Sequence, residues 1–242
     1  MKLKTYPTKQ EVAIQFSRYL AIVIAANKVV HIALSGGSTP KIVFDELAAN
    51  FQSDIDWSGV HLYWGDERCV PADDVESNYK MTIDYLVSKI DIPSKNVHRM
   101  RGENEPEYEA KRYAELMLKN LSKKNGIPYF DLVILGMGDD GHTASIFPNS
   151  IDLWHSEKLC EVAVHPDSGQ QRITLTGRVV NNAKTVVFLV TGSGKAQKVD
   201  QIINKKQDYE MYPAALVAPT SGNLVWFLDA EASGLLNGRK LS

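Results

Sequence analysis

One segment predicts how the chain folds: residues 29–40 read VVHIALSGGSTP. A mainly apolar and β-branched run, residues 29–34, leads into a Ser-Gly-Gly turn. Thr39 and Pro40 then suit the N-cap and the first position of a helix. The order strand, tight loop, helix is typical of a parallel sheet, because parallel strands need crossover connections.

The same pattern recurs along the chain. Strands are predicted at residues 60–64, 130–135, 172–176, 185–191 and 224–228, and helices beginning near residues 8, 77, 106 and 195. The first helix opens with a capping box formed by Thr8 and Glu11. Apolar strands that alternate with helices indicate the α/β class, with a doubly wound, mainly parallel sheet covered by helices on both faces. With no repeat and no linker, we expect one domain over residues 1–242.

Composition excludes several classes of partner. The 242 residues include 27 Lys and Arg against 29 Asp and Glu, a net charge of −2, so no basic field attracts nucleic acid or anionic membranes. Two cysteines, Cys69 and Cys160, are too few for a disulfide framework. The longest apolar run falls far short of the ~20 residues that span a bilayer, and the N-terminus lacks a signal sequence. We expect a cytoplasmic protein, either a monomer or a homodimer.

The loop after the first predicted strand has the chemistry of a phosphate site. Ligands of open parallel sheets bind beyond the carboxyl ends of the strands. Glycines allow close approach of an anion, hydroxyls can donate to it, and a helix N-terminus supplies free N–H groups. The candidate residues are Ser35, Gly36, Gly37, Ser38 and Thr39. A glycine-rich turn with a helix cap is the other interpretation of this loop.

Residues 136–142, GMGDDGH, formally contain the dinucleotide fingerprint G-x-G-x-x-G. We reject that interpretation because two carboxylates would repel a pyrophosphate, and because Pro148 leaves room for barely one helical turn. Asp140 and His142 suit proton transfer better, since imidazole titrates near neutral pH and a carboxylate can orient it. A purely structural histidine is the alternative.

Three basic residues are expected near the same edge of the sheet. Residues 192–195, GSGK, resemble a nucleotide-binding P-loop, but the first glycine of that motif and its Ser or Thr for magnesium are missing. Lys195 still suits a single phosphate, and Arg68 and Arg172 occupy comparable positions at strand edges. Together these cations favour a small phosphorylated substrate.

Two further kinds of site are not supported by the pattern. The acidic residues and His142 have no spacing typical of a metal site, so no metal is expected. No G-x-S-x-G elbow is present, so a serine nucleophile is not expected either. If an ester is cleaved, water should attack it directly.

Five motifs together resemble a known family. They are LSGGSTP at residues 34–40, GDERCVP at 65–71, GMGDDGHTAS at 136–145, RITLT at 172–176 and GKA at 194–196. In order and spacing they resemble the 6-phosphogluconolactonases of the glucosamine-6-phosphate isomerase/6-phosphogluconolactonase family. The resemblance extends from about Ser35 to Trp226, which is most of the chain.

The resemblance implies a Rossmann-like fold and hydrolysis of 6-phospho-D-glucono-1,5-lactone in the oxidative pentose phosphate pathway, without a cofactor. His142 would be the general acid/base, with Asp140 beside it. The residues that would contact the substrate and its phosphate are Ser35, Gly36, Gly37, Ser38, Thr39, Asp66, Arg68, Arg172 and Lys195. The partner would be a small sugar-phosphate lactone, and whether Asp66 touches it or supports a loop stays open.

Two alternatives remain. Glucosamine-6-phosphate deaminases resemble the chain in the phosphate loop, the acidic pair and the Asp-Gly-His turn. Their pattern, however, has glutamate where this chain has Phe147, and tyrosine where it has Arg68; both differences favour the lactonase. The other alternative is a noncatalytic sensor that binds sugar phosphates through the same loops.

Overall fold

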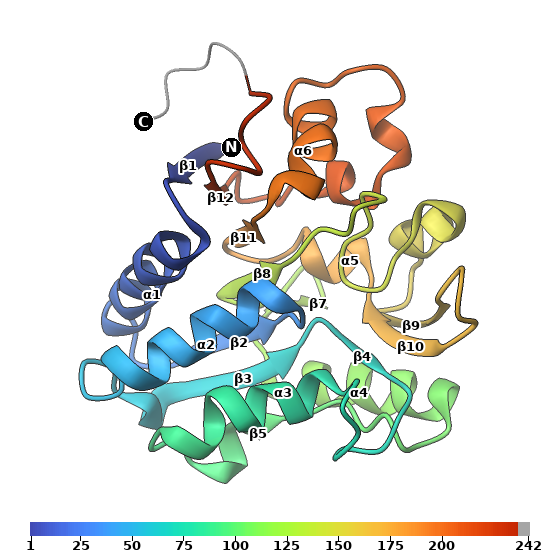
Figure 1. Ribbon diagram of the computed structural model, residues 1–242. Coiled ribbons are helices and arrows are strands. Elements are labelled where there is room, and N and C mark those ends of the chain that lie inside the picture. The colour runs from blue at the N-terminus through green and yellow to red at the C-terminus, as the bar shows by residue number, and fades with distance from the viewer. Residues whose placement is uncertain (237–242) are drawn as a thin grey trace.

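A large parallel sheet forms the centre of the protein, as a computed structural model that describes residues 1–236 shows (Figure 1). Its strand order is β1-β12-β11-β8-β2-β3-β5, and every neighbouring pair is parallel. The strands are β1 (Lys2–Tyr6), β2 (Val30–Leu34), β3 (Val60–Trp64), β5 (Val97–His98), β8 (Leu132–Leu135), β11 (Val186–Val190) and β12 (Leu224–Asp229). The predicted Rossmann-like α/β class is confirmed. The edge strand β1, rich in polar residues, was not predicted.

A second, antiparallel sheet lies beside the first. Its strands, in the order β4-β10-β9, are β4 (Asp66–Arg68), β10 (Gln171–Leu175) and β9 (Cys160–Val164). The strand predicted at residues 172–176 is confirmed as β10, but neither β4 nor a second sheet was predicted. Short polar strands look like loops until their partner is known, because pairing supplies their stability. A small hairpin joins β6 (Lys123–Lys124) to β7 (Ile127–Pro128).

Helices cover both faces of the main sheet. They are α1 (Lys9–Ala25), α2 (Ser38–Asn50), α3 (Asn78–Tyr85), α4 (Pro106–Asn120), α5 (Gly177–Val180) and α6 (Ala196–Ile203). Successive side chains of a strand point to opposite faces. Trp64 accordingly meets Tyr79 of α3, whereas the preceding Tyr63 meets Tyr113 of α4. Figure 1 shows α1, α2 and α3 on one side of the sheet and α4 on the other.

The helix starts were predicted with mixed success. Thr8 caps α1 by accepting from the Glu11 amide at 3.1 Å, but the Glu11 carboxylate accepts from Gln15 rather than closing the capping box. The predicted N-cap at Thr39 was wrong: α2 begins at Ser38, and its N-cap is Gly37 with a φ of 109°. That positive φ favours glycine, so the helix begins two residues earlier than a threonine cap at residue 39 would allow.

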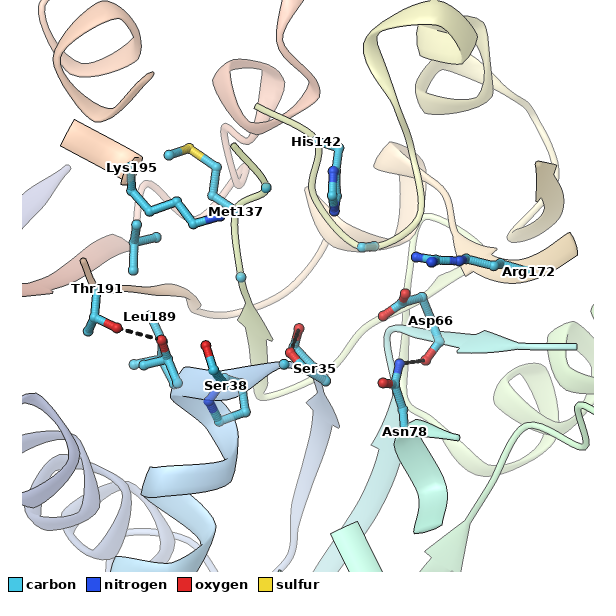
Figure 2. Close-up of a pocket in the computed structure, with 18 of the residues that line it drawn as sticks. Ser35, Ser38, Asp66, Asn78, Met137, His142, Arg172, Leu189, Thr191 and Lys195 are labelled. Carbon is cyan, nitrogen blue, oxygen red and sulfur yellow. Dashed lines mark hydrogen bonds between the residues drawn. The ribbon is translucent and has the colours of Figure 1, made fainter. Parts of the chain in front are cut away.

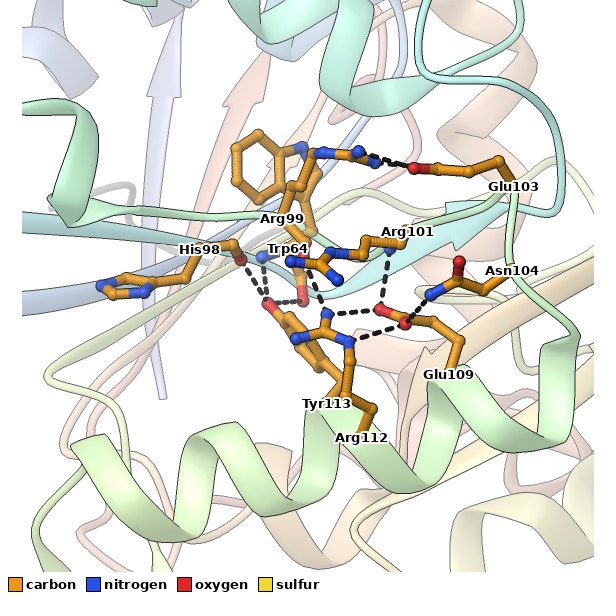
Figure 3. A network of polar contacts seen from close by, with 9 residues as sticks. All are labelled: Trp64, His98, Arg99, Arg101, Glu103, Asn104, Glu109, Arg112 and Tyr113. Atoms are coloured by element: carbon orange, nitrogen blue, oxygen red, sulfur yellow. Dashed lines mark hydrogen bonds and ion pairs between the residues drawn. The ribbon is translucent and has the colours of Figure 1, made fainter.

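A buried polar network fixes α4 against the sheet (Figure 3). Tyr113 accepts from the Trp64 amide at 2.8 Å and donates to the His98 carbonyl at 3.1 Å. The fully buried Glu109 pairs with Arg112 and accepts from the Arg101 amide at 2.7 Å. A buried carboxylate is tolerated when it is paired and hydrogen-bonded in this way. The network therefore holds the strand ends β3 and β5 in register.

Strand order reverses between β2 and β8. From β2 the chain builds outward to β3 and β5, and later segments build the opposite half through β8, β11 and β12. Helices that leave neighbouring strands in opposite directions open a crevice at their carboxyl ends. The loops after β2 and β8, residues 35–37 and 136–147, border this crevice. Within residues 1–236 no helix is both long and apolar enough to cross a membrane.

Three histidines stack across strands β2, β3 and β5. His61 lies between the other two rings, 4.9 Å from His31 and 5.4 Å from His98 by ring centroids, and its Nδ1 is 3.0 Å from His98 Nε2. Burial, helped by the neighbouring imidazoles, lowers the pKa of His98 to about 4 and also lowers the pKa of His61. The stack therefore favours the neutral forms of His61 and His98.

Acid should destabilise the protein through this stack. The unfolded chain binds a proton at each histidine near pH ~6.5, whereas folded His98 does so near pH 4, so the free energy of unfolding falls as the pH drops between these values. The free energy of unfolding should fall between pH 7 and pH 5 by roughly 1 kcal/mol less in His98→Gln than in the wild type, a value that allows for the partial exposure of the ring. Urea denaturation at both pH values measures this. The exposed His155→Gln is the control, and an equal loss in both variants would contradict the prediction.

Candidate active site

A pocket of about 240 Å³ lies in the crevice between β2 and β8 (Figure 2). Its walls come from six separate segments: the loops after β2, β8 and β11, strands β4 and β10, and the start of α3. It is lined by Ser35, Gly36, Gly37, Ser38, Thr39, Pro40, Asp66, Arg68, Asn78, Gly136, Met137, Gly138, His142, Ala144, Arg172, Leu189, Val190, Thr191 and Lys195. All the candidate residues predicted from the sequence, except Asp140, line this one pocket.

The Ser35–Thr39 loop ends at the N-terminus of α2. Gly37 caps the helix, no side chain bonds to its first amides, and Ser38 lies at the pocket wall. These free N–H groups and the positive end of the helix dipole suit an anion. The Thr39 hydroxyl is 2.8 Å from that of Thr191, and either oxygen can be the donor of this hydrogen bond. The loop is thereby linked to the segment that follows β11.

His142 and Asp140 form a hydrogen-bonded pair at the rim. His142 Nδ1 is 2.6 Å from Asp140 Oδ1, and the same oxygen accepts from the His142 amide at 3.1 Å. Gly138 makes this pairing possible, because a Cβ there would lie 2.2 Å from His142 Nδ1. Figure 2 shows the imidazole directed into the pocket. With Nδ1 bound to Asp140, Nε2 is the nitrogen left to face a ligand.

Asp140 is held in its charged form. Burial raises the pKa of its carboxyl, but the hydrogen bond and charge of His142 offset this, so the pKa lies below its usual value. An ionised Asp140 accepts a hydrogen bond from a protonated Nδ1. The neutral ring then carries its lone pair on Nε2. The pair can therefore act as a base toward a bound water.

Arg68 and Arg172 stand directly opposite each other on antiparallel strands β4 and β10. Like charges at such a position are unfavourable unless an anion lies between or beside them. Burial and the charge of Arg68 lower the pKa of Arg172. Arg68 donates to the Glu76 carbonyl, but its buried Nε has no hydrogen-bond partner among the described residues. The pair is thus a site for negative charge.

Lys195 approaches the pocket from the other side. It ends a short 3-10 turn, η5 (Ser193–Lys195), that follows β11, and its ammonium lies 2.6 Å from Asp139 Oδ1. In Figure 2 Lys195 and Arg172 point inward from opposite walls, with His142 between them. The pocket therefore offers positive charge at both ends and a base in the middle.

Asp66 is more a structural anchor than an exposed acid. It is buried, and its Oδ2 accepts from the Ser145 hydroxyl at 2.6 Å. Its carbonyl accepts from the Asn78 side chain at 3.0 Å. Asp66 thus ties β4 both to the loop that carries His142 and to α3, while one edge of it reaches the pocket.

Among residues 1–236 no three His, Cys, Asp or Glu side chains are grouped so that they could hold a metal ion.

The sequence pattern of one family, described as "Glucosamine-6-phosphate isomerases/6-phosphogluconolactonase", matches residues 7–226. The chain belongs to this glucosamine-6-phosphate isomerase/6-phosphogluconolactonase family.

Relatives and solved structures agree with this membership. A protein of Haemophilus influenzae named 6-phosphogluconolactonase is 42% identical over 237 residues, covering 98% of this chain and 100% of the relative. A 6-phosphogluconolactonase structure from Trypanosoma brucei has a TM-score of 0.87 and 28% identity, covering 97% of this chain and 98% of that chain. A monomeric glucosamine-6-phosphate deaminase has a TM-score of 0.83 at 21% identity, covering 97% of this chain and 100% of that chain, and shows the shared fold alone.

Phe147 lies beside the catalytic candidate His142. Its ring is buried and lies 4.7 Å from the His142 ring by centroids, while the Arg172 guanidinium lies 5.7 Å above it. An apolar ring, rather than a second carboxylate, therefore packs against the imidazole. His142 and Arg172 therefore both contact this ring.

Sequence reasoning missed Asn78, Thr191 and the role of Ser145. Ser145 stood in a quoted motif and Asn78 follows a predicted helix start, but nothing local shows that their side chains reach Asp66. Thr191 follows an apolar strand, and its bond to Thr39 joins residues 152 positions apart. Such contacts become visible only when the strands are placed in order.

Glu67 holds the start of α3 beside the pocket. It is 2% exposed, and its carboxylate accepts from the amides of Arg68, Asn78 and Tyr79 at 2.8 Å each and from the Ser77 hydroxyl at 3.0 Å. Burial raises the pKa of Glu67, and these four bonds act against that rise. One carboxylate therefore satisfies the free amides of the helix and fixes Asn78 and Arg68 together.

Glu67→Gln should destabilise the protein by about 1–3 kcal/mol, because the new amide group would face backbone donors instead of accepting from them. Chemical denaturation at neutral pH measures the free energy of unfolding. The exposed Glu115→Gln removes the same charge and should change stability by less than about 0.5 kcal/mol. Equal stability of the two variants would show that the Glu67 network contributes nothing.

Proposed function

We propose that the protein hydrolyses 6-phospho-D-glucono-1,5-lactone to 6-phospho-D-gluconate, as a step of the oxidative pentose phosphate pathway. The observation that carries this proposal is the His142–Asp140 pair, 2.6 Å apart, at a pocket whose opposite walls carry Lys195 and Arg172. Family membership and the names of the relatives support the same substrate.

His142 serves as the general base in this proposal. Its Nε2 takes a proton from a water molecule while the water oxygen attacks the lactone carbon C1. The ionised Asp140 fixes the ring and stabilises the imidazolium that forms. Phe147 packs against the ring and limits its alternative positions.

The same imidazolium completes the reaction. The tetrahedral intermediate expels the ring oxygen, the bond between C1 and that oxygen breaks, and His142 returns its proton to the departing oxygen. The acid formed at C1 then ionises to a carboxylate, so one water is consumed and no other reactant is needed. Arg68, which lines the pocket, is our candidate donor to the negative oxygen of the intermediate.

The substrate phosphate orients the lactone. Lys195 and the N-terminus of α2 with residues 35–39 together supply the positive charge and N–H groups that a phosphate needs, while Arg172, at the opposite wall, contacts another part of the lactone. Binding energy gained there, away from the reacting carbon, holds C1 within reach of His142. Residues Gly36, Gly37 and Ser38 contribute backbone donors rather than charge.

The decisive experiment follows the disappearance of 6-phosphogluconolactone near neutral pH in excess chelator, with spontaneous hydrolysis subtracted. We expect the protein to accelerate it. No acceleration would contradict the proposal. Release of ammonia from glucosamine 6-phosphate would then indicate the deaminase reaction, and binding of 6-phosphogluconate without either reaction would indicate a sensor.

His142→Ala should lower kcat by about 10²- to 10⁴-fold, the range of general acid–base catalysis, with KM changed much less. The exposed His155→Ala is the matched control and should retain wild-type kcat. Steady-state kinetics with circular dichroism to confirm folding measure both variants. A wild-type kcat in the His142 variant would remove this residue from the mechanism.

A further inference from the structure

Lys195 already has an anionic partner within the protein. Its Nζ is 2.6 Å from Oδ1 of Asp139, and the two side chains differ in exposure, 24% for Lys195 and 80% for Asp139. Lys195 lines the pocket. Asp139 belongs to the loop after β8 and contacts Lys195 from outside the pocket. The ion pair thus joins the predicted phosphate ligand to the loop that carries His142.

A phosphate bound at Lys195 would stand next to this carboxylate. The two anions would repel each other at such short range, and both would seek the same ammonium. Asp139 is largely in solvent, so its carboxylate can turn toward water at little cost, because exposed ion pairs contribute little free energy. Lys195 is less exposed and is tied to the turn after β11.

We propose that Asp139 competes with the phosphate of the substrate for Lys195 and thereby weakens the binding of phosphorylated ligands. This inference rests on the proposed function, in which Lys195 receives that phosphate. Asp139 is a specificity-determining residue in this view: it lowers the advantage of the phosphorylated lactone over the plain lactone, and it does not take part in the proton transfer.

The competition extends to the product, which keeps the same phosphate. Hydrolysis creates a second negative group, the carboxylate at C1, and our mechanism places this group near His142. Asp139 lies three residues before His142, and the Gly138 amide bonds to the His142 carbonyl at 2.9 Å, which keeps the loop short and compact. Repulsion from Asp139 therefore favours release of the doubly anionic product.

The test compares Asp139→Asn with the wild type. The variant should lower KM for 6-phosphogluconolactone and the inhibition constant of 6-phosphogluconate about 1.5- to 5-fold, the range of an exposed ion pair. The preference for phosphorylated over plain gluconolactone should rise by a similar factor, and the effect should shrink in high salt. A raised or unchanged KM would overturn the proposal, since it would mean that Asp139 positions Lys195 or has no influence on it.

Two controls make the test specific. Asp54→Asn removes an equal charge from an exposed loop that follows α2, away from the pocket residues, and should leave both constants unchanged. In a Lys195→Ala background, Asp139→Asn should have no effect, because the contested ammonium is gone. The same gain in the Asp54 variant, or in the Lys195→Ala background, would overturn the proposal.

Failure of the proposed function can be told apart from failure of this inference. If the wild type does not hydrolyse the lactone, calorimetric titration of 6-phosphogluconate into the same four variants still measures the competition. Tighter binding to Asp139→Asn that depends on Lys195 supports the inference even then. Equal affinity of wild type and variant refutes it.

Discussion

The site depends on one constraint of topology: seven parallel strands reverse their order between β2 and β8. Parallel strands place all their carboxyl ends at one edge, and the reversal sends the following segments to opposite sides, so a crevice opens there without any special side chain. The phosphate-type loop after β2 and the His142 loop after β8 face each other across it (Figure 2). Burial of apolar side chains stabilises the sheet, and the crevice follows from the order of its strands.

The small antiparallel sheet adds charge to this crevice. It places Arg68 opposite Arg172. The two like charges repel each other, so contacts of the neighbouring residues must hold this arrangement. Glu67, between Asp66 and Arg68, turns to the other side of β4 and binds the start of α3. Asp66 in turn bonds to Ser145 of the His142 loop. Three successive residues thus connect the two halves of the pocket, and local rigidity follows from buried carboxylates that accept hydrogen bonds from other segments.

The charges of the pocket are organised in pairs of unequal exposure. Asp140 is fixed by His142 and supports its basicity, whereas Asp139, the preceding residue, stands in solvent and meets Lys195. Adjacent carboxylates therefore have different partners and different freedom. Phe147 gives the imidazole an apolar neighbour on one side.

The sequence by itself determined the α/β class, the sheet strands with strong apolar runs, and the candidate loops, because residues 35–39, 140–142 and 195 carry their chemistry in short local motifs. Tertiary structure alone decided what depends on distant partners. Polar strands β1 and β4 are stable only when paired, and the start of α2 moved to Ser38 because Gly37 adopts a positive φ. The bonds of Asp66 and Glu67, and the contact between Lys195 and Asp139, join separate segments. Periodicity along a chain reports which face a residue takes, but not which residue will face it.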